Sequence, residues 1–170
     1  MGTRRGFGDE TWRLACAGDA AALGRAADML LGDGELEYEG HRARAFALAV
    51  DGRRDEALVE LSEGWSDDWP PPSAYALDVS RIHYLCHDCE RALAALQLEV
   101  RSLSQWTGVH EIVAACVRRN PALWRRGMSV AVAAEAGGAG KLRAALAVAR
   151  ARLGRRDPPA RPLPEASPGS

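Results

Sequence analysis

The sequence of 170 residues contains almost no lysine: Lys141 is the only one, and arginine carries the rest of the positive charge. It also lacks any apolar run near the roughly 18 residues of a membrane-spanning helix, because charged residues interrupt its alanine-rich stretches. No apolar segment follows the N-terminal arginines, so we expect neither a signal peptide nor a membrane partner, and we expect a cytoplasmic protein. The Arg-rich, Lys-poor and Ala-rich composition is typical of a bacterial gene of high GC content.

Cysteine is scarce too, with four residues that show no disulfide-scaffold spacing, so we expect reduced thiols. No segment alternates apolar and polar residues as a strand does. Motifs of nucleophilic catalysis are missing as well, and the glycine-rich segment 137–141 lacks the spacing of a phosphate loop. We therefore expect no cofactor, and we expect a binding protein in preference to an enzyme.

The charge of the chain is divided unevenly between its two parts. Residues 1–100 carry 10 basic and 19 acidic side chains, whereas residues 101–170 carry 12 basic and 4 acidic ones. Opposite charges of this size favour attraction between the two parts of one chain, or head-to-tail contact between copies in a homo-oligomer.

Apolar residues recur at helical spacing along most of the chain, and polar caps and glycine turns separate the segments. Asp19, Ser73, Asp88 and Asn120 are the expected N-caps of four of these helices. We predict one helical domain over 9–154, after a flexible leader at 1–8 and before a disordered Pro-rich tail at 155–170. The pattern predicts about nine helices, over 9–17, 20–31, 36–50, 54–63, 73–86, 89–103, 108–118, 121–136 and 141–153.

Two ten-residue segments align with each other at a spacing of 35 residues: GRRDEALVEL at 52–61 and HDCERALAAL at 87–96. A repeat of this period is typical of helical hairpins that bury their apolar faces only against one another. The first segment resembles the second helix of a tetratricopeptide repeat, with a glycine at the turn, then acidic residues, Ala-Leu and a later leucine. The second segment departs from that pattern at His87, which stands where glycine is usual.

This resemblance implies an all-α fold, a right-handed superhelical array of antiparallel helical hairpins. It also implies a concave groove lined by the first helix of each hairpin, where such proteins bind peptides. A non-enzymatic accessory or regulatory module that binds a protein or peptide partner is therefore the expected function. The residues of this chain at the groove positions are Glu39, Arg42, Phe46, Arg81 and Tyr84. The two arginines could clamp a carboxylate of the partner.

Two other functions stay open from the residues alone. His83, Cys86, His87 and Cys89 form a dense group of potential metal ligands, which a metal-binding accessory protein or a small metal-dependent enzyme would use. A basic set flanks the Asn120-Pro121 junction beside Trp124 and suggests a nucleic-acid-associated regulator. The acidic first 100 residues argue against nucleic acid as a partner. The basic set comprises Arg118, Arg119, Arg125 and Arg126.

Overall fold

The structure is a computed structural model that describes residues 4–33, 36–66, 70–98, 108–135 and 138–153. These ranges contain nine α-helices, one short 3-10 helix and no strand, which confirms the expected all-α class. None of the described helices is long and apolar enough to cross a membrane. The α-helices are α1 (Arg4–Cys16), α2 (Ala20–Leu30), α3 (Glu37–Val50), α4 (Arg54–Glu63), α5 (Pro72–Leu85), α6 (Cys89–Leu98), α7 (Val109–Arg119), α8 (Trp124–Ala133) and α9 (Gly138–Leu153).

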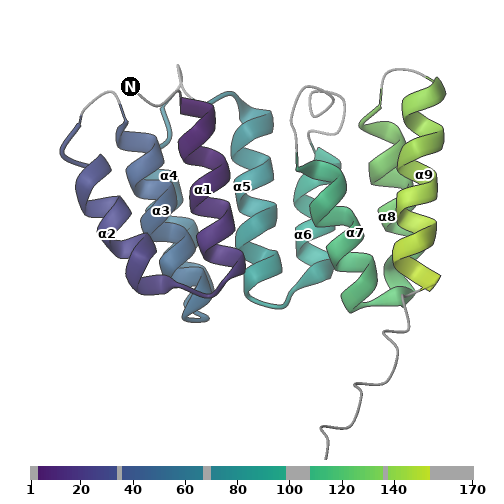
Figure 1. The fold of residues 1–170 in the computed structure, drawn as a ribbon, viewed down its shortest axis with the longest axis horizontal. Coiled ribbons are helices and arrows are strands. Elements are labelled where there is room, and N and C mark those ends of the chain that lie inside the picture. The colour runs from purple at the N-terminus through teal and green to yellow at the C-terminus, as the bar shows by residue number, and fades with distance from the viewer. Residues whose placement is uncertain (1–3, 34–35, 67–69, 99–107, 136–137, 154–170) are drawn as a thin grey trace, which may run out of the picture.

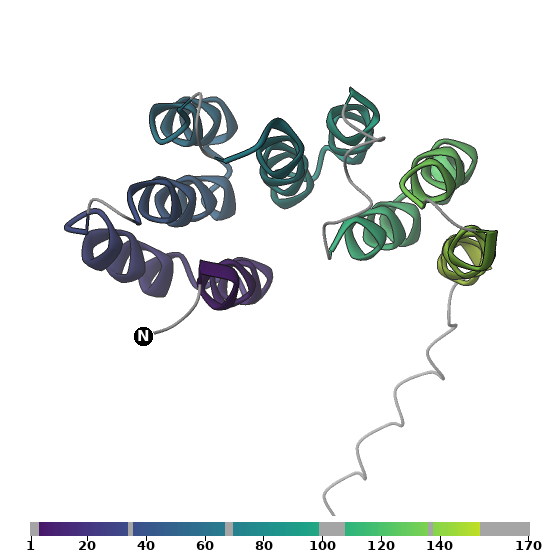
Figure 2. The same ribbon diagram turned by 90° about the horizontal axis from the view of Figure 1, so that it is seen from above.

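The helices stand side by side with their axes roughly parallel (Figure 1). Seen from above, they follow an arc (Figure 2). Helices α3, α5 and α7 lie on the inner side of this arc, and α4, α6 and α8 lie behind them on the outer side. Helix α1 also lies on the inner side, where it packs against α3. We call the surface formed by α1, α3, α5 and α7 the inner face.

The turns that end α1, α3 and α5 share one backbone conformation. Each contains a residue with left-handed φ, namely Gly18 (74°), Gly52 (78°) and His87 (63°), which are 34 and 35 residues apart. In all three, the N–H of this residue donates to the carbonyl three residues earlier, and the next N–H donates to the carbonyl five residues earlier. His87 therefore departs from the glycine pattern in side chain but not in backbone shape, although an L-residue pays a steric cost there.

Two apolar clusters form the core, one in each half of the arc. The first lies among α1–α5 and includes Leu23, Phe46, Leu61 and Ile82. The second lies among α5–α9 and includes Leu93, Leu96, Val113, Val117 and Val130. Trp12 of α1 packs against both clusters, so one side chain from the first helix joins the two halves.

Most predicted helix starts agree with the structure. Asp19, Asp88 and Asn120 each accept a hydrogen bond from a backbone N–H of the helical turn that follows, at 2.9, 3.0 and 3.2 Å. The prediction that Ser73 caps the fifth helix is wrong, because α5 already starts at Pro72. Proline suits this position, since its fixed φ is helical and the first N–H of a helix has no partner within it.

Two helix starts differ from the prediction, and both lie in segments rich in glycine. Helix α1 starts at Arg4, inside the predicted leader, and α9 starts at Gly138, inside the predicted glycine turn. Glycine in a helix costs about 1 kcal/mol relative to alanine, and for this reason the sequence indicated non-helical segments there. The predicted tail at 155–170 lies outside the described residues.

Candidate functional site

The residues expected to contact a partner lie on the inner face, and most of them are buried. The exposed fractions are 3% for Glu39, 8% for Arg42, 0% for Phe46 and 6% for Arg81. Tyr84 is half-buried. Only Tyr84 thus keeps a substantial part of its surface available in this conformation.

Helix α1 contacts four of these side chains, those of Arg42, Phe46, Arg81 and Tyr84. The ring of Trp12 lies 5.9 Å from the ring of Phe46 and 6.2 Å from that of Tyr84, and the Arg81 guanidinium stacks on it at 5.0 Å. Arg42 donates a hydrogen bond of 3.3 Å to the hydroxyl of Thr11. The inner-face residues of α3 and α5 therefore hold the first helix of their own chain.

Both arginines also pair with an internal carboxylate, that of Asp78 on α5. Arg81 Nη1 lies 2.9 Å from Asp78 Oδ1, and Arg42 Nη1 lies 3.8 Å from Asp78 Oδ2. The hydroxyl of Tyr38 donates to the same Oδ2 at 2.8 Å. Burial raises the pKa of Tyr38 well above its ordinary value, and the charge of Asp78 raises it further. Asp78 is itself 2% exposed.

Both arginines face a carboxylate, but it belongs to Asp78 and not to a partner, and only Arg81 donates a hydrogen bond to it. Asp78 was not predicted from the sequence, although it is the one acidic residue of α5 and lies three positions before Arg81, a spacing that allows pairing. Contact of a partner with Glu39, Arg42, Phe46 and Arg81 stays a prediction, and for the last three it requires α1 to move away.

The four potential metal ligands at the end of α5 do not converge. No three of them bring their ligand atoms within 4.8 Å of one another in the part of the chain that the structure describes. The His83 ring is buried, the Cys86 thiol faces the carbonyl oxygen of Ala49 at 3.5 Å, and Cys89 is buried beside Cys116. Burial and the nearby Cys89 raise the pKa of Cys116 far above that of an ordinary thiol.

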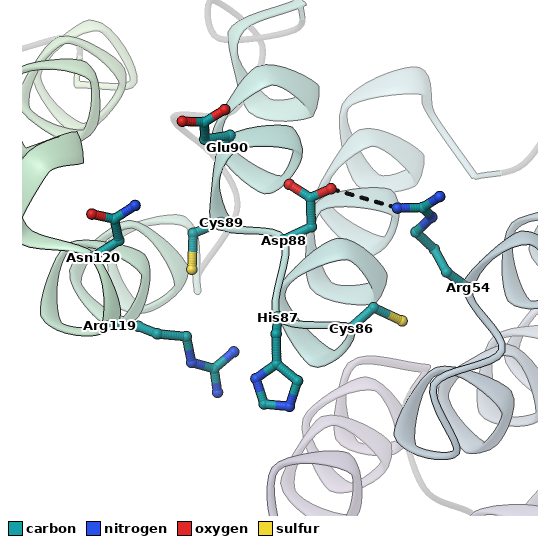
Figure 3. Close-up of a pocket in the computed structure, with 8 residues that line it drawn as sticks. All are labelled: Arg54, Cys86, His87, Asp88, Cys89, Glu90, Arg119 and Asn120. Atoms are coloured by element: carbon teal, nitrogen blue, oxygen red, sulfur yellow. Dashed lines mark ion pairs between the residues drawn. The ribbon is translucent and has the colours of Figure 1, made fainter.

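Cys86, His87 and Cys89 instead line a hollow of about 550 Å³ at the helix turns, which we call the turn pocket (Figure 3). Its walls come from the start of α4, the turn between α5 and α6, and the end of α7. A second hollow of about 320 Å³ adjoins it and shares Arg54 and Cys86 with it. The residues that line the turn pocket are Arg54, Cys86, His87, Asp88, Cys89, Glu90, Arg119 and Asn120.

In the turn pocket, the carboxylate of Asp88 is paired with two arginines, whereas Arg119 keeps most of its hydrogen-bond donors available. Asp88 Oδ2 lies 3.5 Å from Arg54 Nη1 and 3.6 Å from Arg91 Nε, and Oδ1 caps α6. Arg119 donates from Nη1 to the carbonyl oxygen of Tyr84 at 2.7 Å, and its guanidinium lies 4.3 Å from the Tyr84 ring. This hydrogen bond uses one of the five N–H groups of an arginine. In Figure 3 the side chains of Arg119 and His87 lie on one side of the pocket, whereas Glu90 points to the opposite end.

The arginines of the predicted basic set face different neighbours. Arg126 donates to the side chain of Gln97 at 3.0 and 3.1 Å, and Arg125 stacks on Trp124 at 5.7 Å. Arg119 donates to the carbonyl oxygen of Tyr84, and Arg118 is exposed. Nucleic-acid binding by this set stays a prediction.

No family model, curated protein or solved structure matches this chain. The residues and their geometry thus carry the functional argument.

Proposed function

We propose that this protein is a non-enzymatic module that binds a protein or peptide partner, built as a right-handed superhelical array that resembles tetratricopeptide repeats. Three turns of one backbone shape, 34 and 35 residues apart, support the array. The arc of paired helices in Figure 2 supports it further. Such arrays offer long surfaces to which several hairpins contribute, and these surfaces suit extended partners.

The turn pocket is the proposed binding surface, and an acidic segment of the partner is the proposed ligand. Arg119 from α7 and His87 from the turn after α5 present nitrogen atoms on the same side of the pocket, and this observation carries the proposal. Arg119 is exposed and keeps donors beyond the one that it gives to Tyr84. A guanidinium held in place by stacking loses little freedom when it binds a carboxylate.

The proposal also explains the position of Tyr84, the half-buried residue among those expected on the inner face. Its ring supports the Arg119 guanidinium at 4.3 Å, so it would position a binding group and not contact the partner itself. Arg42, Phe46 and Arg81 would have a structural role, because they hold α1 in place.

The test uses peptides selected from a random displayed library against the full chain, with affinity measured by fluorescence anisotropy. We expect the selected peptides to be rich in Asp and Glu. We expect Arg119→Gln to weaken binding by about tenfold or more, because a hydrogen bond to a charged group contributes about 1.5–3 kcal/mol.

Arg118→Gln is the matched control. It removes the same charge from the neighbouring position of α7, which is also exposed but does not line the pocket. Equal losses in the two variants would show that only net charge matters and would contradict the turn pocket as the site. Selection of peptides without acidic residues would contradict the proposed ligand.

A further inference from the structure

A group of three potential metal ligands lies between α3 and α4, away from the turn pocket. His41 of α3 and Glu60 and Glu63 of α4 each bring one ligand atom within 4.8 Å of the other two. Among the described residues it is the one such group of three or more. The sequence repeat does not mark it, because Glu60 lies in the segment 52–61 but aligns with alanine, Ala95, in the second segment.

The local structure explains why these three side chains meet. Glu60 and Glu63 are three residues apart and therefore lie on the same side of α4. His41 Nδ1 lies 2.8 Å from Glu60 Oε1, and both side chains are about 15% exposed. Glu63 is exposed, so a solvent molecule or ion can reach the group from that side.

Gly64, directly after Glu63, holds the imidazole in place. A Cβ atom added to Gly64 would lie 2.7 Å from Cβ and 2.9 Å from Cγ of His41, closer than real contacts allow. The histidine side chain thus packs directly against the backbone of Gly64 at the end of α4. This contact limits where its ring nitrogens can lie and keeps them near the two carboxylates.

We propose that His41, Glu60 and Glu63 bind a divalent transition-metal ion of the zinc class. One imidazole and two carboxylates are a ligand set that Zn²⁺ accepts, with solvent completing the coordination. Ligands about 2.0–2.1 Å from a tetrahedral ion lie about 3.3 Å from one another, so small side-chain rotations suffice from the present positions.

The surrounding charges are compatible with a bound cation. The two carboxylates carry two negative charges, and Arg44 compensates only in part, with Nη1 3.6 Å from Glu60 Oε1. Arg44 also pairs with Asp28 of α2 at 3.5 Å. It can therefore turn toward that residue when a metal ion takes Glu60. Binding would link α3 to α4 and so stabilise this hairpin.

The test is calorimetric titration of the untagged full chain with zinc sulfate. We expect saturable binding of one ion per chain, and a rise of the thermal midpoint with zinc concentration. Glu63→Gln should weaken binding by about tenfold or more, because it replaces a charged ligand by a neutral one of the same shape. Since Glu63 is exposed, this variant is expected to fold normally. His41→Ala should abolish saturable binding, with circular dichroism to verify the fold.

Glu56→Gln on the same helix is the matched control and should leave zinc affinity unchanged. Cobalt(II) supplies a second readout, because a thiolate ligand produces an intense charge-transfer band that nitrogen and oxygen ligands lack. We expect no such band. A thiolate band would assign the ion to a cysteine site and overturn the proposal. Absence of saturable zinc binding, or equal affinity of Glu63→Gln and the unmodified chain, would overturn it as well.

Discussion

Asp78→Ala should severely destabilise the protein. The substitution leaves Arg42 and Arg81 buried without their shared carboxylate, and it removes the acceptor of the Tyr38 hydroxyl. Removing one partner of a buried ion pair costs about 3–5 kcal/mol, and an unsatisfied buried hydroxyl costs about 1–3 kcal/mol more. The domain as a whole is expected to be stable by about 5–15 kcal/mol, so the loss takes a large part of it.

Urea unfolding followed by far-ultraviolet circular dichroism measures this loss. Asp78→Asn separates the two contributions, because an amide oxygen still accepts from Tyr38 while the charge is gone, and its effect should be smaller. The control is Glu56→Gln, which breaks the exposed pair with Arg53 and should leave the unfolding midpoint unchanged. A loss below about 1 kcal/mol for Asp78→Ala would refute the claim that this carboxylate stabilises the two buried arginines.

Two further predictions concern the histidines of α5 and its turn. His87→Gly should stabilise the protein by about 1 kcal/mol in urea unfolding, because glycine adopts φ 63° without the steric cost of a side chain; a destabilised variant would contradict this. Burial lowers the pKa of His83 from its ordinary value of 6.5, so the unfolded chain binds its proton more readily. Stability should be full above about pH 6.5 and fall as the pH drops below it, and His83→Gln should reduce this dependence between about pH 7 and 5.

The helices could largely be predicted because their signals are local. Asp19 and Asp88 cap helices within three residues of themselves, and Gly52 ends a helix by its own backbone freedom. In the first hairpin the sequence match is weak beyond Gly18, and the backbone geometry shows that its turn has the same shape as the other two.

The candidate sites could be predicted only in part. In the sequence, His87 is the residue that departs from the repeat, and in the structure it lines the turn pocket. The sequence places Arg119 in the basic set but does not indicate that it shares a pocket with His87, because the two residues are far apart in the chain. His41 lies 19 residues before Glu60, and its pairing with that carboxylate depends on the register between α3 and α4.

The sequence by itself determined the all-α class, the positions of most helices and the hairpin turns, because these depend on contacts between residues a few positions apart. Only the tertiary structure decided which charges are buried and which are available. Arg42 and Arg81 were expected to face a partner, but both are buried: Thr11 and Trp12 of α1 contact them, and both share the carboxylate of Asp78. The contacts with α1, and the pairing of Arg42 with Asp78, form only when the helices pack. The physical reason is that burial and pairing depend on how distant helices meet, which cap and turn signals do not specify.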